Sequence, residues 1–475
     1  MNIPANVSRR TFLFAAMVGV GVIVDTTLRP LSAAQLLVDN VTGLYGVAVA
    51  RIVQPSTTQD VATTIRTWPG QVAIGGGRFS MGGQVGVAGG LHLDMRQMKR
   101  MVWFQPQQRR IRVQAGMSWR DLQEIIDPHQ LSVMTMQSYA NFTAGGSVAV
   151  NAHGRYVGNG PICNSVQALQ LVLADGSIVE ANRLQYADLF RAAICGYGAI
   201  GVITEVELDL TDNVRIERLV SSMPLSAYRA HFESSVRGDP ASVLHNADLV
   251  PPLYDRPIAI TWKRTDKSLS QTARLTGRGQ SYVAEHSLLW ALTELPMAEH
   301  LQTSVVRPML FAKPMVTWRN LEASQDVAQL EPLTRKISTY VLQEYFIPLA
   351  AHESFARKMA QVLQRYKVVA LNVSIRHSPA DTVSLMPWAA TEVFSFVLYY
   401  KQRSHRGAQE ETGRWTRALI DIALDHGGRY YLPYQLHATK AQFYRAYPEA
   451  AQLRWLKQRV DPAGKFSNEM WRKYL

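Results

Sequence analysis

The stretch QVAIGGGRFSMGGQ, residues 71–84, decides how the chain is interpreted. An apolar run typical of a buried strand leads into three glycines, and two more glycines follow an arginine. Glycine weakens regular structure, so it is useful where φ is positive or where a ligand approaches the backbone closely. A phosphate-binding P-loop would need a lysine, which this stretch lacks. The pattern therefore predicts a strand that ends in a ligand-binding loop, with an ordinary tight connection as the alternative.

Two later segments repeat this density of glycine. They are SYANFTAGGSVAVNAHGRYVGNGP, residues 138–161, and GYGAIG, residues 196–201. The second matches the Rossmann pattern GxGxxG, but a helical segment precedes it and a strand follows it, which is the reverse of the order that nicotinamide binding needs. Main-chain amides of glycine-rich loops can instead converge as a nest that binds pyrophosphate oxygens without a lysine. The three segments together predict one long ligand held by three loops.

Short helices and strands alternate through the first half of the chain, which predicts an α+β fold. A helix is expected after a capping box from Ser56 to Gln59, with Val61, Ile65 and Trp68 on one face. Hairpins are expected over 101–114 and 169–181, a second capped helix over 118–126 and a strand over 202–212. Beyond residue 213 come long helical stretches and aromatic strands such as 337–350, 368–378 and 392–402, and the final helix stops at Pro462 and Gly464.

The composition is that of a large globular protein. Its 475 residues, 47% of them hydrophobic and 18% charged, are enough for two to three domains. The net charge of +13 attracts anionic partners, but arginine tracts and zinc-finger spacings are missing, so nucleic acid is not an expected partner. Two cysteines without a CxxC motif support no metal centre. Cys163 and Cys195 either pair in an oxidising compartment or are small buried residues.

The N-terminus resembles a twin-arginine export signal. Ser8-Arg9-Arg10-Thr11-Phe12-Leu13 runs into an apolar stretch, and LSAA offers a cleavage site after Ala34. The apolar run is shorter than the roughly 20 residues that cross a bilayer. The sequence therefore predicts a signal peptide over 1–34 and a periplasmic or exported protein, with an uncleaved anchor and association with a membrane surface left open.

Taken together, the three glycine loops resemble the PCMH-type FAD-binding domain of the vanillyl-alcohol oxidase superfamily, over residues 45–212. The resemblance implies FAD as cofactor. Many relatives have, at the position of Arg78, a histidine joined covalently to the flavin. A guanidinium does not readily make that bond, so noncovalent FAD is expected, with Arg78 as a positive charge beside the diphosphate or a packing element. The implied cofactor contacts are Gly75, Gly76, Gly77, Arg78, Phe79, Ser80 and Met81, then Gly145, Gly146, Ser147 and His153, then Gly198, Gly201, Val202 and Ile203.

The C-terminal part carries a second resemblance. GGRYYLPY, residues 427–434, and YPEAAQLRWLKQRVDPAGKFSN, residues 447–468, are similar to the endings of sugar-lactone oxidases, alditol oxidases and decaprenylphosphoryl-ribose oxidases. This implies a substrate domain over 213–435 and a C-terminal segment, 436–475, that packs on the FAD domain. It also implies that Glu344 and Arg376 lie over the flavin.

One departure from that group concerns the base. Lactone oxidases have a histidine and then a lysine after the GGR, where this chain has Tyr431 and Tyr434; His437 and Lys440 follow a few residues later. Because the usual lysine is missing, four side chains remain candidates for the catalytic base: Glu344, Tyr434, His153 and Lys440.

The implied activity is oxidation of a hydroxyl group of a sugar, aldonolactone or polyol, by hydride transfer to flavin N5 while a side chain removes the hydroxyl proton. The electron acceptor is oxygen, a quinone or another carrier. Two alternatives stay open. One is a periplasmic oxidase of a polyprenyl-phosphate-linked sugar, and the other is a non-catalytic flavin-fold module that binds anionic envelope components.

Overall fold

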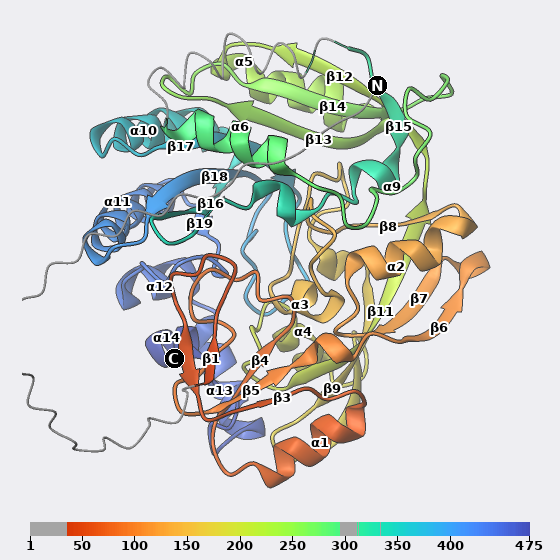
Figure 1. Cartoon of the computed structure of the whole chain (residues 1–475), viewed down its shortest axis with the longest axis vertical. Coiled ribbons are helices and arrows are strands. Elements are labelled where there is room, and N and C mark those ends of the chain that lie inside the picture. The colour runs from red at the N-terminus through yellow and green to blue at the C-terminus, as the bar shows by residue number, and fades with distance from the viewer. Residues whose placement is uncertain (1–35, 295–310, 312, 333) are drawn as a thin grey trace, which may run out of the picture. The chain divides into compact units, whose positions relative to one another are not determined.

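A computed structural model describes residues 36–294, 311, 313–332 and 334–475. The signal peptide expected over 1–34 lies outside these residues. Helices and strands are mixed throughout the described part, which confirms the α+β fold class (Figure 1).

Two small sheets and one larger sheet come from the first half of the chain. Strands β1 and β2 form an antiparallel pair, and β3-β5-β4 is a parallel sheet with β5 in the centre. The larger sheet is antiparallel, in the order β10-β9-β11-β7-β6, and β8 pairs with the end of β11. The strands are β1 Leu36–Val38, β2 Val47–Val49, β3 Arg51–Val53, β4 Val72–Gly75, β5 Leu91–Asp94, β6 Met101–Gln105, β7 Arg110–Gln114, β8 Leu131–Val133, β9 Val166–Val172, β10 Ile178–Asn182 and β11 Val202–Asp212.

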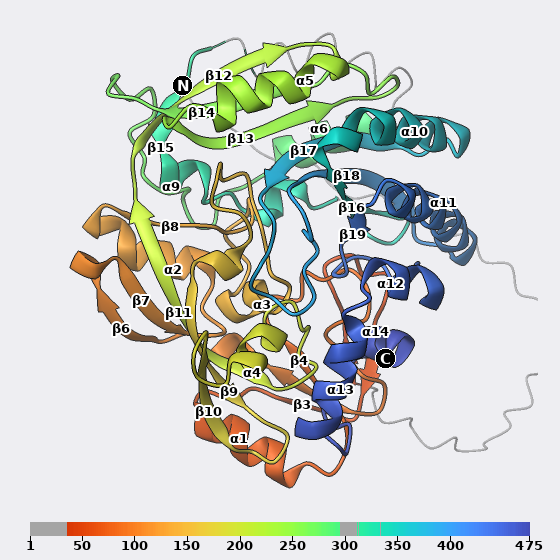
Figure 2. The same cartoon turned by 180° about the vertical axis from the view of Figure 1, so that it is seen from behind.

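An eight-stranded antiparallel sheet is built from the rest of the chain, in the order β15-β12-β14-β13-β17-β18-β16-β19. The aromatic stretches expected to be strands form β16, β17 and β18, neighbours in its centre. Figure 2 shows this sheet and the sheet of β9, β11 and β7 as separate layers, with α3 between them. The strands are β12 Arg215–Ser222, β13 Ser242–Leu249, β14 Ile258–Arg264, β15 Val316–Trp318, β16 Ser338–Pro348, β17 Ala370–Ser378, β18 Val393–Arg403 and β19 Arg429–Tyr430.

Helices cover the sheets and form the C-terminal part. The two longest of those described, α10 and α11, pack against one another beside β16. The helices are α1 Thr58–Thr67, α2 Trp119–Ile126, α3 Ala144–Ala149, α4 Ala187–Ala193, α5 Leu225–His231, α6 Val283–Glu294, α9 Arg319–Glu322, α10 His352–Arg365, α11 Arg406–Asp425, α12 Lys440–Ala446, α13 Ala450–Val460 and α14 Glu469–Tyr474.

Local sequence signals place most of these elements, with one correction at α1. The capping box joins Thr57 and Asp60, one residue later than the expected pair of Ser56 and Gln59. The Thr57 hydroxyl accepts from the Asp60 amide at 3.1 Å, and the Asp60 carboxylate accepts from the Thr57 amide at 3.0 Å. An aspartate serves here because its carboxylate reaches the free amide as well as glutamine does. Trp68 follows the helix as its C-cap.

The remaining motifs behave as expected. Both hairpins form, and Gly176 in the turn of the second has a φ of +81°. Helix α4 precedes GYGAIG and β11 follows it, so this segment is not a Rossmann turn. Cys163 and Cys195 are both free and buried, so they are small core residues and not a disulfide.

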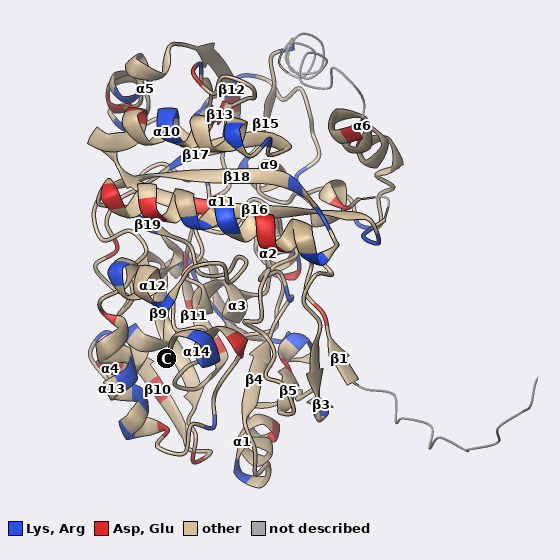
Figure 3. Cartoon of the chain, turned by 90° about the vertical axis from the view of Figure 1, so that its left-hand side faces the viewer, with Lys and Arg blue, Asp and Glu red and all other residues tan. Residues whose placement is uncertain are grey.

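Basic and acidic residues are interspersed along α11, and they do not form one continuous basic face there (Figure 3). Many arginines of the described residues are in ion pairs with carboxylates, for example Arg112 with Glu180 and Glu205. Within the described ranges, no helix combines the length and the apolar character needed to cross a bilayer.

Buried histidines make the fold sensitive to acid. Burial lowers the pKa of His245 to about 3, with the charges of His231 and His377 adding to the effect, and its ring contacts the hydroxyls of Tyr228 and Thr261. Because the unfolded state binds the proton more tightly, stability is fully present above pH ~6.5 and is lost as the pH falls towards 3. At pH 5 we expect His245 alone to cost about 2 kcal/mol of unfolding free energy.

Urea unfolding at pH 7 and pH 5 measures this loss. The variant His245→Gln has no titrating ring, so its free energy of unfolding should fall by about 2 kcal/mol less between the two pH values than that of the unchanged protein. The same slope in both proteins would show that His245 is not the cause.

Candidate functional site

A single large pocket brings the three glycine loops together with the eight-stranded sheet. It is lined by loop residues near 76–81, 137–153 and 197–203, and by side chains of β16, β17 and β18. The loops whose sequences predicted one long ligand therefore face one cavity.

The first loop leaves β4 at Gly75 and lines the pocket from Gly76 to Met81. None of the main-chain N–H groups from Gly76 to Ser80 donates a hydrogen bond to the described part of the chain. A Cβ on Gly76 would collide with Oγ1 of Thr143, so the close approach of the two loops requires glycine there. Free amides in a glycine-rich loop are donors suited to anionic oxygens.

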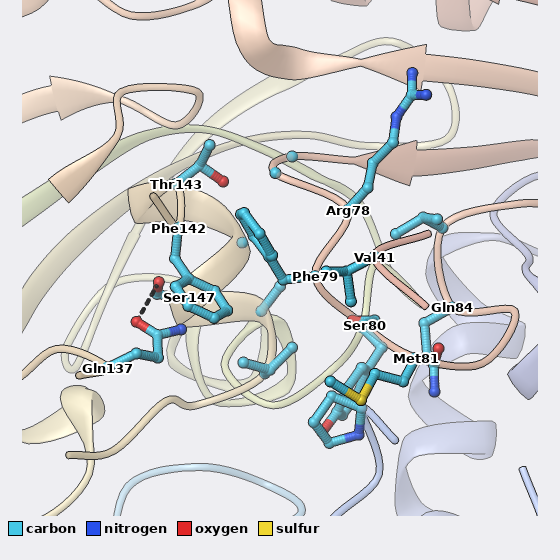
Figure 4. Close-up of a pocket in the computed structure, with 18 of the residues that line it drawn as sticks. Val41, Arg78, Phe79, Ser80, Met81, Gln84, Gln137, Phe142, Thr143 and Ser147 are labelled. Atoms are coloured by element: carbon cyan, nitrogen blue, oxygen red, sulfur yellow. Dashed lines mark hydrogen bonds between the residues drawn. The ribbon is translucent and has the colours of Figure 1, made fainter. Parts of the chain in front are cut away.

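Arg78 within this loop is held by an acid. Its guanidinium lies 3.1 Å from the carboxylate of Asp94, which also pairs with Arg96 at 2.6 Å. Burial would raise the pKa of Asp94, but its hydrogen bonds with Arg96 and Gln54 lower it well below the ordinary range. Arg78 extends away from Ser80 and Met81 in Figure 4, and its backbone has a φ of +60°. The positive charge of Arg78 is thus paired with the carboxylate of Asp94.

The second loop opens into the short helix α3. Gly145, Gly146, Ser147 and His153 all line the pocket. The Ser147 hydroxyl donates to Oε1 of Gln137 at 2.9 Å, as Figure 4 shows, which ties α3 to the preceding loop. The ring centroids of Phe79 and Phe142 lie 4.5 Å apart, so aromatic contact joins the first two loops.

The third loop turns through residues of positive φ. Tyr197 has a φ of +49° and Gly198 of +72°, and both line the pocket with Ala199, Gly201 and Ile203. The amides of Gly198, Ile200 and Gly201 donate no hydrogen bond within the described residues.

A buried acid lies at the sheet side of the pocket. Alternation along β16 turns Tyr340, Leu342 and Glu344 to the same face, so all three line the cavity. Oε1 of Glu344 lies 2.7 Å from Nε2 of His153, and the two side chains are 2% and 5% exposed. The hydroxyl of Tyr434 donates to Oε2 of Glu344 at 3.1 Å.

Electrostatics keep this acid ionised. Burial raises the pKa of Glu344, but the neighbouring His153, the charge of Arg376 and the Tyr434 hydrogen bond outweigh it and lower the pKa below its ordinary value. Burial, together with the Glu344 charge, raises the pKa of Tyr434 well above 10. Tyr434 is therefore a hydrogen-bond donor, and Glu344 is the acceptor available for a proton.

Arg376 and Tyr431 differ in what they contact. Arg376 on β17 lines the pocket, and its guanidinium makes no hydrogen bond or ion pair with the described residues, so its donors are free for a ligand. Tyr431 donates its hydroxyl to the carbonyl of Val150 at 2.8 Å, and its own amide donates to the carbonyl of Glu344. Tyr431 thus fastens the strand that carries Glu344 to the loop that carries His153.

Comparison with known proteins agrees with this geometry. Residues 49–182 match the family model of the FAD binding domain, and residues 249–474 match that of D-arabinono-1,4-lactone oxidase. The chain is 23% identical to L-gulonolactone oxidase of Bos taurus, over 89% of this chain and 94% of that protein. It is 34% identical to alditol oxidase of a Streptomyces species, over 25% and 28%, and 23% identical to L-gulono-1,4-lactone dehydrogenase of Mycobacterium tuberculosis, over 90% and 96%.

The chain is an FAD-dependent oxidoreductase, and its two parts are similar to an FAD binding domain and to D-arabinono-1,4-lactone oxidase. Its cofactor is FAD, and the pocket fits that group by the chemistry of its donors. The free amides of the first loop suit a diphosphate, and those of Gly146 and the third loop add further donors. The hydroxyls of Ser138 and Thr143, which line the pocket, are buried without a partner among the described residues, as expected where a polar ligand belongs.

Three of the residues expected in the site of the flavoenzyme lie outside the pocket. Gly75 ends β4 and packs against the ring of His92, and Val202 is a buried core residue of β11. Lys440 is exposed at the first turn of α12, so it is removed from the candidate bases. Gly75 and Val202 belong to the quoted glycine segments, whereas Lys440 was considered only because it follows the place of the missing lysine. Neighbouring residues of a strand point to opposite faces, so Ile203 lines the cavity where Val202 does not.

Other lining residues were missed by the sequence analysis. Thr143 and Gln137 flank or lie within the quoted second segment but carry no motif of their own. Leu342 and Tyr340 could have been found from Glu344, since every second residue of a strand shares a face. Val397 and Tyr399 on β18 required the strand order, which the sequence does not contain.

Proposed function

We propose that the flavoenzyme oxidises a hydroxyl group of a sugar, aldonolactone or polyol. The observation that carries the proposal is a buried, ionised carboxylate, Glu344, facing the same cavity as the free amides of the cofactor loops. The names of the relatives, L-gulonolactone oxidase and alditol oxidase, support a substrate of this class. FAD, when bound, supplies the hydride acceptor.

Glu344 takes the proton of the reacting hydroxyl. A carboxylate whose pKa is low is ionised at neutral pH and can accept a hydrogen bond from the substrate hydroxyl. His153, 2.7 Å from Oε1, and Tyr434, 3.1 Å from Oε2, hold the carboxylate in place. The guanidinium of Arg376, which has no partner among the described residues, binds other oxygens of the substrate and orients it. Aromatic side chains such as Phe79, Phe142 and Tyr434 line the pocket and exclude water from the part that they cover.

The domain limits belong to the same proposal. We assign cofactor binding to residues 45–212, substrate binding to 213–435 and a C-terminal segment to 436–475 that packs on the cofactor domain. We also propose that FAD is held without a covalent bond, because the residue at the linking position is Arg78 and its guanidinium is paired with Asp94. Export through the twin-arginine route remains part of the proposal.

The purified protein can be used to test both the noncovalent binding of FAD and the proposed substrate class. The protein should be yellow, and mild denaturation followed by filtration should release the flavin into the filtrate. Anaerobic addition of aldonolactones, polyols and free sugars should then bleach the flavin absorbance with one of these classes. Flavin retained by the denatured chain would contradict noncovalent binding, and an unbleached flavin with every compound would contradict the proposed substrate class.

A further inference from the structure

Lys457 on α13 reaches the third loop of the cofactor pocket. Its Nζ donates to the carbonyl of Ala199, to the carbonyl of Phe466 and to the carboxylate of Asp461, each at 2.7 Å. All three ammonium donors are therefore used, one of them on a residue that lines the pocket. Asp461 is 0% exposed, so the contact is an internal one.

Two more side chains of the C-terminal part hold the same loop. Asn468 donates to the carbonyl of Tyr197 at 3.0 Å, and Trp471 donates through Nε1 to the carbonyl of Gly196 at 3.1 Å. The carbonyls of residues 196, 197 and 199 thus all accept hydrogen bonds from side chains of residues 450–475.

These contacts bear on the main-chain amides and the backbone conformation of the third loop. Three carbonyls of the loop are bonded to the C-terminal part. The amides of Gly198, Ile200 and Gly201 have no partner among the described residues, and these three residues line the cavity. The loop passes through positive φ at Cys195, Tyr197 and Gly198, a shape that its own sequence does not favour at the two non-glycine positions. Hydrogen bonds from other parts of the chain are therefore needed to maintain this backbone conformation.

We infer that Lys457 is a positioning residue for the cofactor, acting through the third loop. With Asn468 it keeps the loop amides turned to the pocket, so the C-terminal segment sets how tightly FAD is held. Lys457 does not line the cavity itself and has no role in the choice of substrate. The inference needs FAD as the cofactor but is independent of which hydroxyl is oxidised.

The test is the rate at which FAD leaves the diluted holoenzyme, followed by the rise of free-flavin fluorescence. Lys457→Met removes the ammonium group, and Asn468→Asp keeps the cap of α14 but removes the donor to Tyr197. Both variants should release FAD at least about tenfold faster, as expected for the loss of a hydrogen bond from a charged or buried donor. Arg459→Met is the control, since it removes an exposed charge from the last turn of the same helix.

Measurements of activity distinguish a positioning role of Lys457 and Asn468 from general damage to the protein. In both variants, added FAD should restore kcat, with an unchanged KM for whichever substrate bleaches the flavin. If Lys457→Met does not fold, Asn468→Asp alone decides the question. Release at the rate of the unchanged protein in the folded variants, or lost activity that excess FAD fails to restore, would overturn the inference; neither result bears on the substrate class.

Discussion

Glu344→Gln will lower kcat by about 100-fold or more, the usual contribution of a general base. Glutamine keeps the size of the side chain and can still contact His153 and Tyr434, but it cannot take a proton. Because Glu344 lies on β16 and not in the cofactor loops, the variant should retain FAD. Anaerobic stopped-flow measurement of flavin reduction isolates the affected step from reoxidation by the acceptor.

The dependence of activity on pH is a second test of Glu344 as the base. The pKa of Glu344 is lowered in the folded protein, so the base is ionised above that pKa and activity is lost only as the pH falls through it, below the ordinary value of 4.5. Glu344→Gln should lack this acidic limb. Stability also declines in acid, so each rate must be taken before the protein unfolds.

Glu331→Gln is the matched control, because Glu331 also lines the pocket but makes no ion pair among the described residues. We expect its kcat to stay within about threefold of the unchanged enzyme, since no proton transfer is assigned to it. A Glu344→Gln enzyme as active as this control would remove Glu344 from the role of base.

Local signals were sufficient for much of the fold. The strand before the first glycines, both hairpins and the helix capped by Ser118 follow from alternation, turn residues and caps, which depend only on near neighbours. The strand order of the eight-stranded sheet does not follow from such local signals, because β13 pairs with β17 across a long separation in the sequence. The one-residue error at α1 arose because Ser56 and Thr57 both suit an N-cap.

Some residues of the site could likewise be predicted from the sequence, and others could not. Glycines of the three loops are visible because they meet a backbone requirement that few other residues can meet. The contact of His153 with Glu344 could not be predicted, since it joins a loop to a strand that is remote in sequence. Tyr434 is one of the four candidate bases in the sequence, and only its burial next to a carboxylate identifies it as a hydrogen-bond donor.

Gly76→Val should yield a folded protein that contains almost no flavin. A Cβ at this position would collide with the Thr143 hydroxyl, and moving the loop to avoid it would turn the amides of Gly76 to Ser80 out of their common orientation. Since several of these donors act on one diphosphate, losing their convergence should weaken FAD binding by at least about 100-fold. The ratio of absorbance near 450 nm, roughly the flavin maximum, to protein absorbance measures the cofactor content.

Gly407→Val provides the comparison, because it makes the same substitution at an exposed position in the first turn of α11, where a Cβ would meet only ordinary contacts. This variant should carry the normal amount of FAD. Far-UV circular dichroism should show that both variants are folded, because Gly76 lies in a loop after β4 and is not a core residue. A folded Gly76→Val protein with a full complement of flavin would mean that the diphosphate does not bind at the first loop, and the assignment of the three loops to one cofactor would have to be replaced.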